Sequence, residues 1–222
     1  MKKRLFLPAL ALFLSGQLCS SAILPQDMVK PNGLPLTGKW MFTLDLKPAN
    51  WLGQKYQGNE LREPINLFVI DQRSASTAEA IRNLSRACHK AGYESRWGHS
   101  GGYQGYLAAA FYPKLPAEKN RAFSDAPFTV NNNHGRFFGP YFDGKRYYFS
   151  ASFSRELVVL TIDRKKMHKY GSFKKARNDF AGRMDKKTNY KIVKYIDLKN
   201  SLVNDQTLTT GDHDGRAVLL LN

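Results

Sequence analysis

A tight turn signal near the middle of the chain constrains its fold more than any other feature. Asp143-Gly144 stands between two long strand-like runs, and a two-residue type I′ turn needs positive φ at both central positions, which Asp-Gly tolerates. The sequence therefore predicts a β-hairpin in which Phe142 opposes Lys145. The other opposed pairs on that face are then Pro140 with Tyr147, Phe138 with Phe149, Arg136 with Ala151, and His134 with Phe153.

Two segments have the pattern of amphipathic helices. Ser76-Thr77-Ala78-Glu79 has the spacing of a capping box, apolar residues then recur at helical intervals, and Gly92 supplies a stop, so we predict a helix over 76–91. A second helix is predicted over 172–184, with Phe173, Ala176 and Phe180 facing inward.

The remaining apolar runs are typical of strands. We predict an α+β fold, in which a mainly antiparallel sheet carries both helices on one side of a single domain. The further strands are expected at 39–46, 65–70, 93–97, 106–112, 157–162, 191–198 and 216–221, with loops over 48–63 and 98–105.

The first 22 residues have the pattern of a secretory signal peptide. Basic residues 2–4 precede an apolar run of ten residues, 5–14, and Ser20-Ser21-Ala22 fits a small-x-small cleavage site. We expect cleavage after Ala22 and a periplasmic or secreted product, with no later membrane span, an irregular arm over 23–38 and one domain over 39–222. Leu18 before Cys19 does not fit a lipobox, and Cys88 is then the one cysteine left, which predicts a buried structural thiol.

Positive charge is unevenly distributed along the chain. The formal net charge is +16, and removal of the leader leaves +13. Residues 164–199 hold 13 Lys and Arg against three Asp, a net of +10. Such a field attracts polyanions, although a basic surface also serves solubility alone.

His134 and Arg136 lie two apart on the predicted hairpin, so their side chains point the same way. An imidazole beside a guanidinium can bind a phosphate or carboxylate, or combine acid catalysis with anion binding; a hydrogen-bonded pair at a sheet edge is the alternative. His168 opens the basic segment as a second candidate acid or base. The further candidates are Asp179, to orient a histidine, and Arg177, Lys165 and Lys166, to bind a ligand.

Other chemical motifs are weak. The five histidines are not paired at zinc spacing, Gly101-Gly102-Tyr103-Gln104-Gly105 lacks the residues of a phosphate-binding loop, and no Gly-x-Ser-x-Gly elbow occurs. Asp212-His213-Asp214-Gly215 has too few spaced oxygen ligands for a calcium loop and indicates a turn. We therefore expect no metal ion and no cofactor.

The order of several motifs resembles the LssY C-terminal domain family over about 120 residues, 64–184. The resemblance is carried by Pro64-Ile65-Asn66-Leu67 and the helix after it, His134-Gly135-Arg136-Phe137-Phe138, Tyr147–Ser152, and His168 followed by Arg177-Asn178-Asp179. The chain has one histidine where the family tends to have two, and Asn178 separates Arg177 from Asp179. The resemblance implies a setting in the cell envelope and a cluster around these residues, and it implies no particular reaction.

Three functions follow as hypotheses. The first is an exported binding module for an anionic partner, which could be a lipid headgroup, lipopolysaccharide, polysaccharide or nucleic acid. The second is a phosphoester or glycan hydrolase that uses His134 and His168 as acid and base with Arg136 holding the anion. The third is a secreted effector or toxin with a basic docking surface. The oligomeric state is left open.

Overall fold

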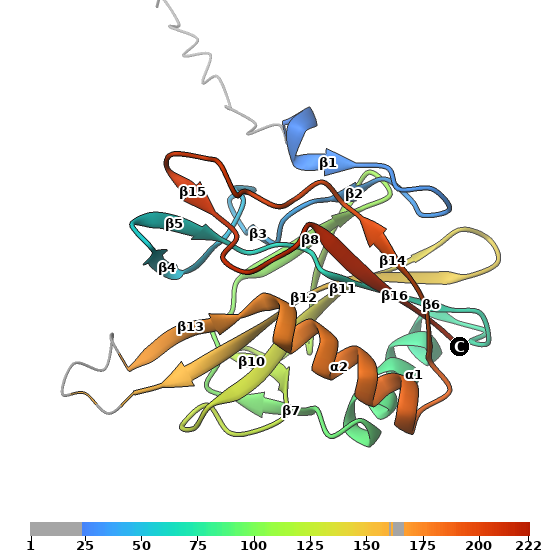
Figure 1. Cartoon of the computed structure of the whole chain (residues 1–222). Coiled ribbons are helices and arrows are strands. Elements are labelled where there is room, and N and C mark those ends of the chain that lie inside the picture. Colours follow the sequence, from blue (N-terminus) through green and yellow to red (C-terminus); the bar gives the residue numbers. More distant parts are fainter. Residues whose placement is uncertain (1–23, 160, 162–166) are drawn as a thin grey trace, which may run out of the picture.

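The β11–β12 hairpin (Asn132–Phe142 and Tyr147–Val158) runs through the middle of a curled sheet in the computed structural model (Figure 1). Strand β12 pairs antiparallel with β6 (Leu67–Asp71), which in turn pairs in parallel with the C-terminal strand β16 (Arg216–Leu221). The structure describes residues 24–159, 161 and 167–222. The predicted leader, Lys165 and Lys166 lie outside the described residues.

The large sheet has thirteen strands and is mixed, with antiparallel pairs in the majority. A second sheet of three strands lies beside it in the order β15-β5-β4. The other elements of the large sheet are β1 (Met28–Val29), β2 (Thr37–Gly38), β3 (Phe42–Thr43), β7 (Glu94–Trp97), β8 (Tyr103–Leu107), β9 (Ala110–Leu115), β10 (Arg121–Ser124), β13 (His168–Ser172) and β14 (Lys191–Asp197); the small sheet has β4 (Asn50–Tyr56), β5 (Asn59–Arg62) and β15 (Leu208–Thr209), and a 3₁₀ turn covers Pro25–Asp27.

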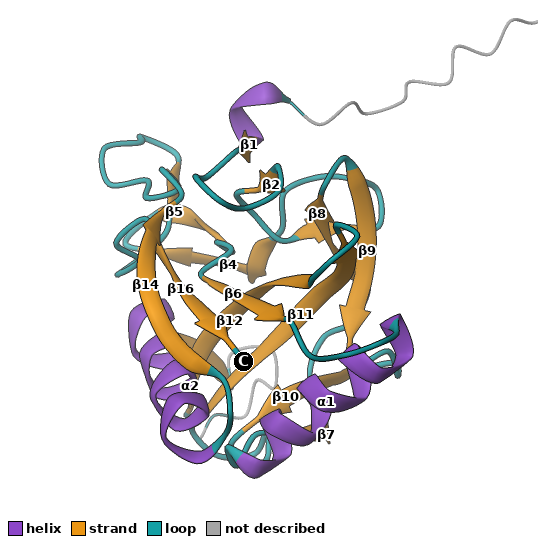
Figure 2. Cartoon of the chain, turned by 90° about the vertical axis from the view of Figure 1, so that its right-hand side faces the viewer, coloured by secondary structure: helices purple, strands orange, loops and turns teal. Residues whose placement is uncertain are grey.

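Helices α1 (Thr77–Lys90) and α2 (Phe173–Lys187) cover one face of the central strands, as Figure 2 shows. Their apolar sides share one buried cluster with alternate residues of β6, β11 and β12, among them Val69, Phe137 and Phe153. The predicted α+β class with two helices is therefore compatible with the structure. The Ser76 Oγ accepts the Glu79 N–H at 3.2 Å, as the capping box predicts, while the Glu79 carboxylate accepts the Ala75 N–H instead of the Ser76 N–H.

The opposite face of the central strands is apolar over only part of its length. Phe68, Phe138, Tyr148 and Leu219 form a second buried cluster there, which the segment around Met41 covers. Because side chains alternate along a strand, Phe138 is followed on this face by Arg136 and His134 in the direction of the β11 N-terminus. The covered face thus changes from apolar to polar along one hairpin.

The predicted hairpin is confirmed, but its register is wrong. The loop contains four residues, 143–146, because the Asp143 carboxylate accepts the N–H groups of Lys145 and Arg146 at 2.9 and 2.7 Å and holds a wider turn. Phe142 therefore pairs with Tyr147, and the ladder shifts again at Gly139. As a result His134 opposes Ser154 and Arg136 opposes Ser152.

Several predicted boundaries are also wrong. The segment 48–63 contains β4 and β5, and the predicted strand 106–112 is divided by a turn at Ala108 and Ala109. The predicted strand 39–46 is reduced to Phe42–Thr43, because the chain turns after Thr43: the Leu46 N–H donates to the Thr43 carbonyl at 3.1 Å, and Leu44 is 69% exposed. The run from Leu157 completes β12 through Val158, and β10 and β13 were not anticipated. The strands expected near 65–70, 93–97, 191–198 and 216–221 are confirmed.

Candidate functional site

A row of polar side chains continues the covered face of the β11–β12 hairpin. Asn132, His134 and Arg136 alternate along β11, and each is at most 5% exposed. Ser154 and Glu156 face them from β12, because the ladder pairs Asn132 with Glu156 and His134 with Ser154. Buried polar groups at this density are costly unless they are hydrogen-bonded or functional.

Three segments that are distant in sequence close over this row. Strand β4 contributes Trp51 and Leu52, the residue after β5 is Glu63, and the loop between β7 and β8 contributes His99. Together with the hairpin they enclose a pocket of about 110 Å³. The pocket is lined by Trp51, Leu52, Glu63, Gly98, His99, Ser100, His134, Arg136, Glu156 and His168.

The Glu156 carboxylate is the centre of the polar contacts. Its Oε1 lies 2.8 Å from His168 Nδ1, although the imidazole N–H is not aligned with that oxygen. Its Oε2 lies 3.8 Å from His134 Nδ1 and accepts a hydrogen bond of 3.2 Å from the Asn132 amide. The rings of His99 and His134 are also in contact, with centroids 4.4 Å apart. Three imidazoles and one carboxylate therefore converge.

Asn132 fixes the protonation of the His134 ring. The Asn132 Nδ2 donates to Glu156 and to the Val130 carbonyl, so its Oδ1 is the acceptor that lies 2.9 Å from His134 Nδ1. His134 Nδ1 then carries the proton and Nε2 keeps its lone pair. Ser154 Oγ lies 3.4 Å from that Nε2 and accepts a hydrogen bond from the Trp51 indole at 3.1 Å.

Arg136 brings a positive charge to the pocket. One Nη donates to the Ser100 carbonyl at 2.7 Å, and the guanidinium lies 5.0 Å from the centre of the Tyr103 ring. Its Nε has no hydrogen-bond partner among the described residues, although it is buried. A buried donor without a partner is ready to bind an acceptor group of a ligand.

Burial sets the protonation of the pocket near neutral pH. It lowers the pKa of His99 to about 3, helped by the charges of Arg136 and His168, and it lowers the pKa of His134 well below its usual value. It raises the pKa of Glu63 to about 7 against the opposing charge of Arg136, and it raises that of Glu156 against His168. His99 and His134 are therefore neutral at pH 7, and Glu63 can give or take a proton.

The structure brings together three of the residues that the sequence singled out. His134, Arg136 and His168 all line the pocket, with His134 and His168 on either side of one carboxylate. Asp179 does not orient a histidine: it accepts a hydrogen bond from Tyr93 at 2.7 Å and forms an ion pair with Arg183 at 2.9 Å, on the side of the helices.

Arg177 likewise binds no pocket group, because it is buried against Asp214 and the Arg216 carbonyl. Asp212 and Asp214 belong to the predicted turn, and they hold the N-terminal half of α2.

The residues missed from the sequence include His99, Glu63 and Glu156, which line the pocket, and Asn132, which contacts His134 and Glu156. His99 stands in a glycine-rich loop with no nearby partner in the chain, and nothing around Glu63 distinguishes it. Glu156 and Asn132 could not be paired from the sequence either, because the register expected there, extended by two residues, opposes Asn132 to Arg155. The register of the structure, shifted by one residue, pairs Asn132 with Glu156. The predicted hairpin stopped short of this pair.

Comparisons with protein-family models, with curated proteins and with solved structures find no match to this chain. The site is therefore interpreted from its own geometry. Within the described residues, no helix combines the length and the apolar character that a membrane crossing requires.

Proposed function

We propose that this chain is a hydrolase of phosphoesters and that the pocket at Glu156 is its active site. One observation carries the proposal: His134 and His168 reach the same carboxylate of Glu156, in a pocket that Arg136 also lines. Ester hydrolysis of an anionic substrate requires groups that give and take protons and a fixed positive charge.

The composition of the pocket favours a reaction over simple anion binding. Glu63 and Glu156 both line it, and carboxylates repel a bound anion, so a pocket made only for binding gains nothing from them. In a hydrolase, the two carboxylates can take part in proton transfer. Arg136 would bind the phosphoryl oxygens through its Nε, which has no partner among the described residues.

The proposed step uses one water molecule. The water oxygen bonds to phosphorus while His168 takes its proton, and the Glu156 carboxylate, 2.8 Å from His168 Nδ1, offsets the charge on the imidazole. The bond from phosphorus to the ester oxygen breaks, and protonated Glu63 gives its proton to the departing alkoxide. Transfer of the proton from His168 to Glu63 through solvent restores both groups.

A phosphoester fits the pocket better than a glycan. At about 110 Å³ the pocket is well below the ~300–1,000 Å³ of sites that enclose a drug-sized molecule, so it takes one charged group and leaves the rest of the substrate outside. Leu52 is 44% exposed at the rim and offers an apolar contact to that outer part.

The test is hydrolysis of p-nitrophenyl phosphate, bis-p-nitrophenyl phosphate and p-nitrophenyl glycosides by the purified protein, with and without added divalent metal. We expect a phosphoester to be cleaved, and we expect His168→Asn to lower kcat by about 10²–10⁴-fold. Arg136→Lys keeps the positive charge but loses the planar guanidinium with its several N–H donors, so it should raise KM. The exposed residue His89 on α1 gives the matched control His89→Asn, with unchanged kinetics. Cleavage of glycosides alone, or full activity in His168→Asn, would refute the proposal.

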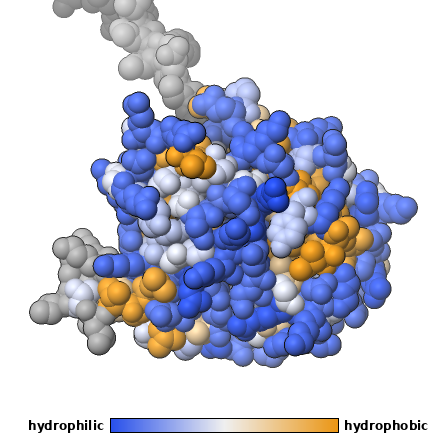
Figure 3. Space-filling view, viewed as in Figure 1, coloured by the Kyte–Doolittle hydropathy of each residue, from blue (hydrophilic) through white to orange (hydrophobic). Residues whose placement is uncertain are grey.

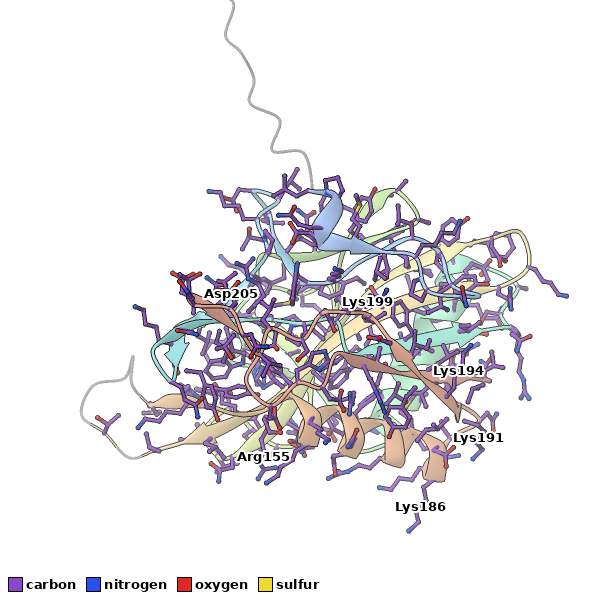
Figure 4. All side chains as sticks on the ribbon, turned by 45° about the horizontal axis from the view of Figure 1, so that its top comes forward. Arg155, Lys186, Lys191, Lys194, Lys199 and Asp205 are labelled. Atoms are coloured by element: carbon purple, nitrogen blue, oxygen red, sulfur yellow. The ribbon has the colours of Figure 1, made fainter. Side chains whose placement is uncertain are left out.

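A surface feature favours a second function, the binding of an anionic partner through β14. This strand ends the order of the large sheet, and it exposes Lys191 and Lys194 beside Ile192, Val193 and Tyr195, which are 37%, 51% and 49% exposed. Figure 3 shows hydrophobic residues on the face where β14 lies, and in Figure 4 Lys186 joins the same side from the end of α2. Lysines around exposed apolar side chains suit an anionic lipid surface.

Binding to vesicles with anionic or neutral headgroups, to lipopolysaccharide and to DNA tests this second function across salt concentrations. We expect binding to anionic vesicles that weakens as salt rises, and we expect it to be lost in Lys191→Glu with Lys194→Glu. The matched control is Lys119→Glu with Lys145→Glu, which changes the net charge equally at other exposed lysines. Equal loss in both double variants would assign the binding to net charge and not to β14.

The proposed setting is the periplasm or the medium outside the cell, where the phosphoester would be an envelope or nutrient compound. Recovery of the protein from culture medium in place of the periplasm would favour the alternative of a secreted effector.

A further inference from the structure

We propose that His99, His134 and Glu156 bind one divalent transition-metal ion of the Zn²⁺ class. One nitrogen of each histidine and one carboxylate oxygen of Glu156 all lie within 4.8 Å of one another, and all three residues are buried. Metal bonds of about 2.0–2.2 Å bring ligand atoms closer than this, so the three side chains would have to draw together around a bound ion. The catalytic use of the ion rests on the proposed hydrolysis, whereas its binding does not.

The geometry also leaves one nitrogen of His99 available to an ion. His99 Nε2 is buried and has no hydrogen-bond partner among the described residues. A metal ion would satisfy this nitrogen, which otherwise leaves a desolvated polar atom unpaired.

The surrounding contacts have the form of a second coordination shell. Asn132 accepts from His134 Nδ1 and donates to Glu156 Oε2, so one amide orients two of the three ligands. His168 Nδ1 lies at the other oxygen of Glu156, at 2.8 Å. Metal ligands in proteins are held by partners of this kind, which set the tautomer of a histidine and the direction of a carboxylate.

The donor set selects the class of ion. Two imidazoles and one carboxylate suit zinc and its neighbours, whereas calcium and magnesium take mainly oxygen ligands. Three protein ligands leave at least one coordination position for water. The pocket also holds Glu63 and Arg136, so an ion bound there would sit beside the group that we propose to hold the phosphoryl oxygens.

In the hydrolysis, the ion would lower the pKa of the water that attacks phosphorus, and His168 would still receive the proton. The bonds formed and broken remain those of the step above. His168 is then a base that also orients the ligand Glu156, and His168→Asn should weaken zinc binding by about tenfold.

The test is zinc binding by the purified protein without an affinity tag, after removal of metal with a chelator. A chromophoric chelator in competition gives the stoichiometry and Kd, and circular dichroism follows folding and Tm. We expect one Zn²⁺ per chain, a higher Tm with zinc, and a rise in Kd of at least 100-fold in His99→Gln and in Glu156→Gln. The matched controls His89→Gln and Glu118→Gln change exposed residues of the same types and should bind zinc as the unchanged protein does.

The inference is overturned if the unchanged protein takes up no zinc, or if His99→Gln and Glu156→Gln bind it as tightly. Should these variants fail to fold, pulsed EPR of the unchanged protein loaded with Cu²⁺ decides: two coordinated imidazoles support the site, and fewer or none refute it. Zinc binding without phosphoester hydrolysis would leave the metal site standing and refute the proposed function. Hydrolysis by metal-free protein would leave the proposed function standing and refute the catalytic use of the ion.

Discussion

At the scale of single residues, Arg177 shows how this chain places a charge inside its core. The side chain is 1% exposed, and its two terminal nitrogens bind the Asp214 carboxylate at 2.6 and 3.1 Å. The remaining donors reach Asn178 and the Arg216 carbonyl, and the guanidinium lies 5.4 Å from the centre of the Tyr195 ring. The pair thus ties α2 to the C-terminal strand.

Asp214→Asn should destabilise the protein by about 3 kcal/mol. The change keeps the shape of the side chain but leaves the buried Arg177 charge without its counterion, and uncompensated buried charges cost about 3–5 kcal/mol when a partner is removed. Urea unfolding followed by fluorescence measures the difference. Glu118→Gln, at an exposed position, is the control and should change the free energy of unfolding by less than about 0.5 kcal/mol.

The same pair predicts an acid limit to stability. Burial alone would raise the pKa of Asp214, but the hydrogen bonds and charge of Arg177 outweigh it and lower the pKa from 3.8 to about 2. A depressed pKa contributes stability that is complete above pH 3.8 and is lost as the pH falls toward 2. Between these pH values the unchanged protein should therefore lose more stability than Asp214→Asn does, in urea titrations at each pH. Parallel losses in the two proteins would show that Arg177 does not hold this carboxylate.

The catalytic candidates at this scale could be predicted only in part. His134 and Arg136 were found because residues two apart on a strand point to the same face of the sheet. This relation does not depend on the register of the hairpin. His99 could not be found in this way. It lies between Gly98 and Ser100 in a glycine-rich loop, and only the closure of the 98–100 loop over β11 brings it to His134.

At the scale of elements, the packing between β11 and β12 decides where the pocket lies. Gly135 separates His134 from Arg136 on β11, and its cross-strand partner is Phe153. The Phe153 ring lies over the position that a side chain at 135 would take, and it stacks on Phe180 of α2 with centroids 4.2 Å apart. Position 135 therefore requires a glycine, because the Phe153 ring approaches the backbone there too closely for a side chain.

Gly135→Ala should destabilise the protein by about 2 kcal/mol and also reduce catalysis. A Cβ at this position would lie 2.4 Å from the Phe153 ring, which α2 holds in place, and overpacking of a core costs about 1–3 kcal/mol. The displaced strand carries His134 and Arg136, so kcat should fall with stability. Urea unfolding and the phosphoester assay measure the two effects. Unchanged stability would mean that β11 can move away from Phe153 freely.

Gly182→Ala makes the same chemical change, but we expect it to stabilise the protein. Gly182 lies on the exposed side of α2, and a Cβ there meets no atom within 4 Å. Alanine favours a helix over glycine by about 1 kcal/mol, so the free energy of unfolding should rise by about that amount in the same urea experiment. A loss of stability here would show that α2 is constrained in a way that its surroundings do not reveal.

The elements themselves were predicted where local chemistry decides them. Both helices have periodic apolar faces, and α1 has its capping serine, so their sequences alone define them. The β8–β9 hairpin was missed because its turn is made by Ala108 and Ala109, with φ of 50° and 66°, where glycine or asparagine is the usual signal. Tertiary packing imposes that turn, and no local pattern reports it.

At the scale of the whole molecule, the polar pocket and the basic surface occupy different parts of the described chain. The pocket lies under β4 and the 98–100 loop, whereas the lysines of β14 lie along the edge of the large sheet (Figure 4). Two proposals on separate surfaces can be tested by separate variants. Loss of vesicle binding in the β14 double variant should therefore leave phosphoester hydrolysis unchanged.

The predicted leader would set the compartment in which both surfaces act, and its cleavage can be tested by two substitutions. Small side chains are needed at the first and third positions of a small-x-small site, which here are Ser20 and Ala22, while the middle position tolerates a large one. In the native host, mass spectrometry should find a chain that begins at Ile23. Ala22→Phe should abolish this cleavage and leave the chain longer, whereas the matched control Ser21→Phe should leave it intact. Equal processing of both variants, or a chain that keeps Met1 in the unchanged protein, would remove the reason to place this site outside the cytoplasm.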